Sequence, residues 1–184
     1  MSQIIGYMLT WTTYGSWLPG DERGYVKDGQ TLPSNSQVLQ ASKKRQKSPT
    51  VTLDKLQIKL VQQTILAEAE RIGHKILALA VRNNHVHLVL LSHSESIEDA
   101  VGRYKSITTR VLWKHGKKGR IWIKGYDKRF CFSEKELATR IKYVQNHTRS
   151  LLTPGPVPGA QNHKKVRIPS KKLNNQSALT CIRL

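Results

Sequence analysis

Two apolar runs of strand length, residues 74–81 and 85–91, lie close together near the middle of the chain. Only the polar turn Arg82-Asn83-Asn84 separates them, which predicts an antiparallel β-hairpin. Because both runs are apolar almost throughout, we expect them to be central strands of a sheet. The other elements of the chain should therefore pack around this hairpin.

The segments before the hairpin predict one strand, one long loop and one helix. Residues 4–13 are rich in β-branched and aromatic side chains, as in a first strand. Residues 17–52 contain Pro, Gly, Ser, Asn and a basic cluster but no sustained apolar period, so we interpret them as a long, basic, DNA-contacting loop. Helical spacing begins after Thr52, a good N-cap residue, and ends at Gly73.

The segments after the hairpin predict two more helices and one more strand. Apolar residues recur at about one helical turn through residues 96–113, and residues 120–125 have the pattern of a short strand. A last helix should begin at Ser133, where Glu136 completes a capping box. The expected buried stripe of this helix comprises Leu137, Ile141 and Val144.

The predicted order is β, α, β, β, α, β, α. This order is typical of an α+β fold, a ferredoxin-like (RRM-like) antiparallel sheet backed by helices. With 184 residues the chain is long enough for one compact catalytic domain, which we place at residues 1–153, followed by a basic tail at residues 154–184. Enzymes and RNA-binding modules share such a fold, so it does not decide the function.

The charge of the chain favours a nucleic-acid partner. Its formal net charge is +19, more than solubility requires. Basic residues are dense between positions 103 and 129, where Asp127 is the single acid, and this stretch predicts a track for backbone phosphates. The candidate DNA contacts are Arg103, Lys105, Arg110, Lys114, Lys117, Lys118, Arg120 and, on the last helix, Arg140.

Other classes of protein are disfavoured by the composition. The two cysteines, Cys131 and Cys181, are too few for a disulfide framework or a four-ligand zinc site, and they suit a reduced cytosol. Neither a secretory signal nor an apolar run of about 18 residues is present. We therefore expect a cytoplasmic protein that is not associated with a membrane. The residues after position 160 are basic without any acid, which fits either a DNA contact or a solvated tail.

The sharpest local pattern is the His-x-His pair in the second apolar run. Strand alternation places His85 and His87 on one face and Val86 and Leu88 on the other. Two imidazoles that project together can share a metal ion. The pair alone is also compatible with half-buried polar residues near the end of a hairpin.

A second pattern, on the last helix, adds to the first. Tyr143 and His147 are four residues apart and so share a helix face, offset from the apolar stripe. A tyrosine hydroxyl is a poor nucleophile with a pKa of about 10, and attack on a phosphodiester also requires its negative charge to be neutralised. A divalent metal held by His85, His87 and His147 would neutralise it. Taken singly, Tyr143 also fits an aromatic residue at the core margin, and His147 a surface residue.

Together these features resemble the HUH single-tyrosine transposases of bacterial insertion sequences, above all the REP-associated tyrosine transposases. The resemblance spans roughly residues 4–150. It rests on Thr10-Trp11-Thr12-Thr13, Asn84-His85-Val86-His87-Leu88, Trp122 with Tyr126-Asp127, and Tyr143-Val144-Gln145-Asn146-His147.

The resemblance implies roles for four residues. In such enzymes two histidines and a polar side chain one turn after the tyrosine hold Mg²⁺ or Mn²⁺, and the tyrosine attacks the DNA phosphate. These roles fall here on His85, His87, His147 and Tyr143. Relatives usually carry Asn or Gln where this chain has His147, and a third imidazole shifts the preference from Mg²⁺ towards softer ions such as Mn²⁺, Co²⁺ or Zn²⁺.

The implied activity is that of a metal-dependent single-stranded DNA endonuclease and strand transferase that acts on hairpin-flanked DNA. Tyr143 would form a 5′-phosphotyrosine bond and release a 3′-hydroxyl, and a 3′-hydroxyl would later reverse the bond without ATP. Both a monomer and a homodimer are compatible with the sequence. The sequence is equally compatible with a transposase that moves its own gene and with one that serves its host.

Two other functions compete with this one. A non-catalytic, RRM-like binder of single strands accounts for the charge and the sheet, but it leaves the ordered histidines and tyrosine unexplained, and no RNP-like pattern lies on a central strand. A zinc-dependent hydrolase with the same three histidines and a bound water makes Tyr143 dispensable.

Overall fold

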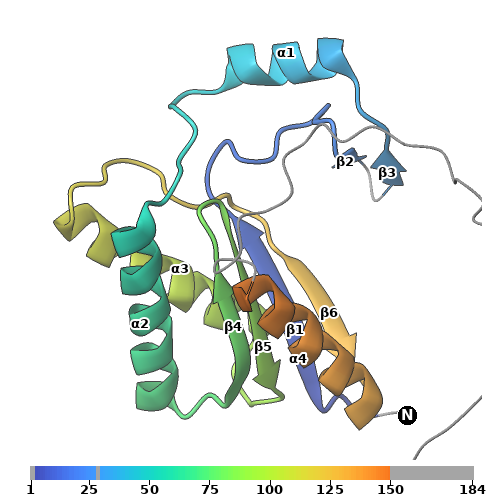
Figure 1. Cartoon of the computed structure of the whole chain (residues 1–184), viewed down its shortest axis with the longest axis vertical. Coiled ribbons are helices and arrows are strands. Elements are labelled where there is room, and N and C mark those ends of the chain that lie inside the picture. The colour runs from blue at the N-terminus through green and yellow to red at the C-terminus, as the bar shows by residue number, and fades with distance from the viewer. Residues whose placement is uncertain (1–2, 28–29, 150–184) are drawn as a thin grey trace, which may run out of the picture. The chain divides into compact units, whose positions relative to one another are not determined.

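The computed structural model describes residues 3–27 and 30–149, and its centre is an antiparallel sheet of four strands in the order β4-β5-β1-β6 (Figure 1). The strands are β1 (Gly6–Thr12), β4 (Ile76–Val81), β5 (His85–Leu91) and β6 (Asp127–Cys131). Three helices join or follow them: α2 (Lys55–Ile72), α3 (Ile97–Lys114) and α4 (Glu134–Arg149). The predicted ferredoxin-like order and the central β4-β5 hairpin are confirmed.

The helices cover opposite faces of the sheet (Figure 1). On one face, α2 and α3 pack over the side chains of Leu9, Val86 and Leu88. On the other face, α4 packs through Leu137 and Val144, with Ile141 at the edge, against residues such as Val89. The predicted stripe of α4 is therefore confirmed, and strand alternation turns His85 and His87 towards the α4 side.

The helix ends follow local hydrogen-bonding rules. Asp54, and not Thr52, caps α2 in a reciprocal capping box with Gln57, because Leu53 is buried and its backbone N–H donates to the Asn83 carbonyl at 2.7 Å. At the other end Gly73 takes the left-handed conformation, with φ 75°, that a C-cap requires.

The start of α4 differs in one detail from a capping box. The Ser133 hydroxyl accepts from the Glu136 N–H at 3.3 Å, as predicted. The Glu136 carboxylate, however, accepts from the Phe132 N–H at 2.8 Å, one residue before the expected position. The observed arrangement and a regular capping box both give two N–H groups at the start of the helix a hydrogen-bond acceptor.

The prediction of a strand at residues 120–125 was wrong. This segment makes one isolated bridge, between Thr13 and Trp122, and the fourth strand is β6. The Lys105 ammonium group takes up the carbonyl groups of Ile123, Lys124 and Gly125, at 2.9 to 3.3 Å, so they do not pair as a strand. The sequence of β6 is mostly charged, which is the pattern of an edge strand and not of a buried one.

The prediction of one long loop at residues 17–52 was also wrong. The segment contains a hairpin of β2 (Tyr25–Lys27) and β3 (Gln30–Leu32), followed by α1 (Ser36–Arg45). None of the residues described in α1 is buried, so the helix has no apolar period to reveal it. Gly20, with φ 89°, lies so close to the backbone of Asn35 and Leu39 that a side chain there would collide with α1.

The basic tail predicted at residues 154–184 lies outside the described residues. Within residues 3–27 and 30–149, no helix combines the length and the apolar character needed to span a membrane.

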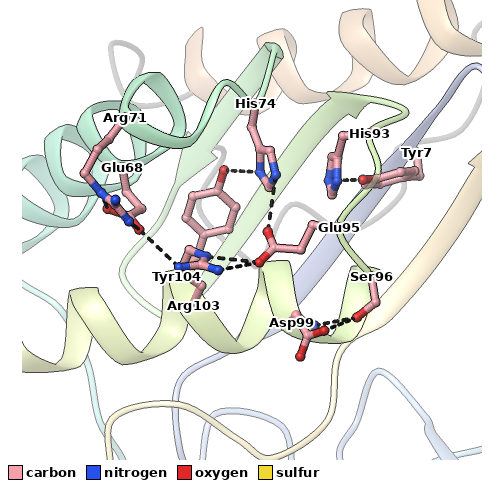
Figure 2. Close-up of polar contacts among 10 residues, drawn as sticks. All are labelled: Tyr7, Glu68, Arg71, His74, His93, Glu95, Ser96, Asp99, Arg103 and Tyr104. Carbon is pink, nitrogen blue, oxygen red and sulfur yellow. Dashed lines mark hydrogen bonds and ion pairs between the residues drawn. The ribbon is translucent and has the colours of Figure 1, made fainter.

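A polar cluster ties the ends of β4 and β5 to α2 and α3 (Figure 2). His74 and His93 stack with ring centroids 3.7 Å apart. The two ring nitrogens of His74 face the Tyr104 hydroxyl at 3.0 Å and the Glu95 carboxylate at 3.2 Å. Arg103 also bonds Glu95, at 2.6 Å, so its charge is engaged within the protein.

Candidate active site

Three imidazoles and one phenol meet on the α4 face of the sheet. The ring centroids of His85 and His87 are 4.7 Å apart, and His147 lies 4.9 Å from His87 and 5.9 Å from His85. Each of the three histidines offers a nitrogen within 4.8 Å of the others. The three side chains predicted as a set are thus brought together by one strand and one helix of the same chain, and they could hold a metal ion.

Tyr143 stands beside this cluster. Its ring centroid is 4.7 Å from that of His147 and 5.5 Å from that of His87. Its side chain remains 44% exposed. The phenol of Tyr143 is therefore accessible to solvent.

Hydrogen bonds orient the two strand histidines. The Nδ1 of His85 donates to the Asn84 side-chain oxygen at 2.7 Å, which leaves the lone pair on Nε2. That Nε2 atom is buried and has no hydrogen-bond partner among the described residues. The Nδ1 of His87 bonds the Thr10 hydroxyl at 2.8 Å. Metal-binding histidines are commonly oriented in this way, by a bond from the second ring nitrogen.

Burial also sets the charge of these imidazoles. Removal from water, with a smaller contribution from the neighbouring His147, lowers the pKa of His85 to about 4. Burial, with smaller contributions from His85 and His147, likewise lowers the pKa of His87 to about 4. Both rings are therefore neutral near pH 7, the state in which an imidazole nitrogen can bind a metal.

The four residues line a pocket of about 330 Å³, here called the His-Tyr pocket. Its other lining residues were not predicted as site residues, although Thr10, Thr12 and Asn84 belong to the motifs that carry the family resemblance; the remaining ones are Ser16, Trp17 and Arg23. The two threonines could have been found, because β1 pairs with β5 so that Thr10 faces His87 and Thr12 faces His85. No sequence signal places Trp17 and Arg23 there, since they come from the segment interpreted as a loop.

The predicted DNA contacts are not gathered around this pocket. Helix α3 covers the opposite face of the sheet, and Arg103 is bound to Glu95. The Lys105 ammonium group is held by three backbone carbonyls, and burial lowers its pKa to about 8. The Lys117 ammonium group donates to the Thr52 carbonyl at 2.9 Å. These three cations have partners within the protein.

The remaining predicted contacts differ in their surroundings. Arg110, Lys114 and Lys118 are exposed. Arg140 lies on α4 near the Cys131 thiol and does not line the His-Tyr pocket. The Arg120 guanidinium lies 5.6 Å from the centre of the Tyr14 ring, on the side of the molecule that carries Trp17.

Comparisons with known proteins identify a family. The family model described as "Transposase IS200 like" matches residues 36–147. No curated protein matches the chain. A solved REP-associated tyrosine transposase bound to a REP hairpin is 10% identical, with a TM-score of 0.49, over 78% of this chain and 67% of that one. A transposase-like protein from Deinococcus radiodurans R1 is 19% identical, with a TM-score of 0.42, over 80% of this chain and 93% of that one.

The assignment rests on the family model, since both structural likenesses are remote. Its match spans more than half of the chain and includes the histidine pair, Tyr143 and His147. The chain therefore belongs to the family of IS200-like transposases.

Proposed function

We propose that this transposase cuts and rejoins single-stranded DNA through a covalent bond to Tyr143, beside a divalent metal held by His85, His87 and His147. Membership of a transposase family makes the chain a DNA-cleaving enzyme. The observation that carries the finer proposal is the meeting of these four side chains around one pocket. The catalytic unit would be residues 1–153, and the substrate would be DNA next to a hairpin.

The donor set fits a metal ion. The buried Nε2 of His85 lacks a protein partner, and a buried polar atom without a partner is costly, so an ion bound there would remove that cost. A bound divalent ion would neutralise charge on the non-bridging oxygens of the attacked phosphate. Three nitrogen ligands favour Mn²⁺ over Mg²⁺.

The reaction is a transesterification in two steps. The Tyr143 oxygen forms a bond to phosphorus while the bond from phosphorus to the 3′ oxygen breaks. The tyrosine loses its proton and the departing 3′ oxygen gains one, which leaves a 5′-phosphotyrosine and a free 3′-hydroxyl. Because one phosphoester replaces another, a 3′-hydroxyl can reverse the step without ATP.

Neighbouring side chains support this chemistry. Asn84 and Thr10 hold the rings of His85 and His87 so that the remaining ring nitrogens are free to bind. Because the pKa of each ring is lowered, protons do not compete with a metal ion for these ring nitrogens near neutral pH. The exposed ring of Tyr143 stands where a phosphate held by the cluster would be in reach.

The test is a comparison of two variants on labelled hairpin DNA with Mn²⁺. Wild-type protein should become attached to the label, and Tyr143→Phe should abolish attachment while it leaves DNA binding nearly unchanged. Tyr25→Phe is the matched control, since it deletes the same hydroxyl from a tyrosine that does not line the pocket. Attachment that persists in Tyr143→Phe would contradict the proposal.

A metal-dependent hydrolase is the second candidate, because three imidazoles are also the ligand set of zinc enzymes that activate water. In that case Tyr143→Phe would still cut the DNA, and no protein would be attached to the product. The same experiment therefore separates the two functions.

A further inference from the structure

A second pocket, of about 460 Å³, adjoins the His-Tyr pocket, and the Trp17 ring lines both. We call it the Trp17 pocket. The residues that give it its chemistry are two aromatic side chains, Tyr14 and Trp17, and three basic ones, Arg45, Arg120 and Lys124. None of its lining residues is acidic. Its volume lies in the range typical of pockets for small ligands, about 300 to 1,000 Å³.

The Trp17 ring is held in place although its surface is open. Its indole N–H donates to the Gly24 carbonyl at 2.8 Å. The Arg23 guanidinium lies 5.3 Å from the ring centre and is itself fixed by bonds of 2.7 and 2.9 Å to Asp21. The side chain nevertheless remains 48% exposed. A ring that is already ordered loses little conformational entropy when a flat ligand stacks on it.

The other walls of the Trp17 pocket provide a second fixed ring and positive charge. The Tyr14 hydroxyl accepts from the Lys47 N–H at 3.1 Å, and the Arg120 guanidinium lies 5.6 Å from the Tyr14 ring. Arg45, in the last turn of α1, and Lys124 are exposed. Open aromatic rings beside cations are the features by which proteins bind single-stranded nucleic acid, since rings stack on bases and cations face phosphates.

We propose that the Trp17 pocket binds the nucleotide next to the scissile phosphate, with its base stacked on Trp17 and its backbone facing Arg45, Arg120 and Lys124. The inference rests on the proposed function, because a strand attacked by Tyr143 in the His-Tyr pocket must leave that pocket, and Trp17 is the wall that the two pockets share. It also gives a role to α1 and to the segment before it. Stacking does not select a particular base, so this contact positions the strand.

The test measures the affinity of full-length protein for a fluorescent oligothymidylate of about 12 nucleotides at several salt concentrations. Trp17→Ala should weaken binding about tenfold, the loss of one stacked base, and Trp17→Phe should restore most of it. The salt dependence should stay unchanged in both variants, since no charge is removed. Arg45→Gln should instead lower the slope of log affinity against log salt by about 0.7.

Trp113→Ala is the matched control. Trp113 is 50% exposed, and its indole N–H donates to the Gly119 carbonyl at 2.8 Å. It therefore resembles Trp17 in its exposure and in its hydrogen bond to the backbone, but it does not line the Trp17 pocket. Its replacement should leave the affinity unchanged. Wild-type affinity in Trp17→Ala, or equal losses in the Trp17 and Trp113 variants, would overturn the proposal.

An abasic oligomer of the same length isolates the stacking contact, because it keeps the phosphates and lacks the bases. Wild-type protein should prefer oligothymidylate to this oligomer, and Trp17→Ala should lose part of that preference. An equal preference in both proteins would overturn the assignment of the base to Trp17.

Failure of the proposed function gives a different result. If wild-type protein showed the Trp17-dependent binding but formed no covalent DNA adduct, the role of Tyr143 would be wrong and the nucleotide site would stand. If the adduct formed and Trp17→Ala bound like wild type, the nucleotide site alone would be wrong.

Discussion

Two pairs of buried or half-buried histidines lie at opposite ends of β5, and they differ in the groups that surround their rings. His85 and His87 are at the start of the strand, and His93 follows its end, stacked on His74. Burial lowers the pKa of all four imidazoles. A lowered pKa therefore does not distinguish a functional histidine from a structural one in this protein.

The surroundings of the rings do distinguish the two pairs. Both ring nitrogens of His74 face protein groups, Tyr104 and Glu95, and His93 bonds the Tyr7 hydroxyl (Figure 2). At the other end, the buried Nε2 of His85 has no partner among the described residues, and a third imidazole approaches from α4. The buried Nδ1 of His93 also lacks a hydrogen-bond partner among the described residues, so a missing partner alone does not indicate a binding site. The convergence of three imidazoles does distinguish His85 and His87, because no such group of three metal-binding side chains forms around His74 and His93 in the described part of the chain.

The largest expected effect separates the two pairs by activity. His87→Ala should lower DNA cleavage per folded molecule by more than about 100-fold, because it removes a proposed metal ligand. His93→Ala should leave that rate nearly unchanged and should instead lower the free energy of unfolding. Cleavage assays and urea unfolding of both variants measure the contrast, and equal losses of activity would remove the distinction.

Metal binding should stabilise the fold through the histidines of the His-Tyr pocket and not through His74 and His93. At an Mn²⁺ concentration about 100 times the dissociation constant, the free energy of unfolding should rise by about 2.7 kcal/mol in the wild type. His147→Ala should lose most of this gain, whereas Tyr104→Phe should keep it. Thermal unfolding with Mn²⁺ and with a chelator tests this, and a wild-type midpoint indifferent to Mn²⁺ would rule the metal site out.

Deletion of one hydroxyl should destabilise the other pair. Tyr104→Phe leaves the buried Nδ1 of His74 without its partner, which should cost about 1 to 3 kcal/mol of folding free energy. Tyr25→Phe serves again as a control and should change the stability by less than about 0.5 kcal/mol. Urea unfolding measures both. An unchanged stability in Tyr104→Phe would show that the cluster in Figure 2 does not support the fold.

The smallest expected effect is a dependence of stability on pH. Burial lowers the pKa of His74 and His93 in the folded state below the ordinary value of 6.5, and for His74 the nearby Glu95 and Glu68 partly oppose this shift. The unfolded chain therefore binds protons first as the pH falls through about 6.5. The stability should be complete above that pH and should decrease below it.

Unfolding at about pH 7.5 and about pH 5.5, with a chelator present, measures this decrease. His85 and His87 contribute in the same direction, so the double variant His74→Gln, His93→Gln should retain part of the pH dependence. A wild-type stability that rose on acidification would contradict the assigned shifts.

Local patterns predicted which side chains meet in the candidate active site, because the geometry within each pair is local. Strand alternation was sufficient to pair His85 with His87, and the i, i+4 relation was sufficient to pair Tyr143 with His147. That these pairs meet depends on the packing of α4, which its apolar stripe indicated correctly.

Contacts between distant segments could not be predicted in the same way. The sequence shows that Arg103 and Lys105 are basic, but their partners are Glu95 and the carbonyls of residues 123–125, which only the folded chain brings to them. Helix α1 has no buried residue among those described, and β6 is charged, so neither has the apolar period by which an element is recognised.

The most direct test of the account is the identity of the residue that carries DNA. Full-length protein would be incubated with single-stranded hairpin DNA and Mn²⁺, digested with protease and nuclease, and the peptides would be analysed by mass spectrometry. We expect a nucleotide linked through its 5′-phosphate to Tyr143, absent when Mn²⁺ is replaced by a chelator. A nucleotide on another residue, or cleaved DNA without any modified peptide, would contradict the account.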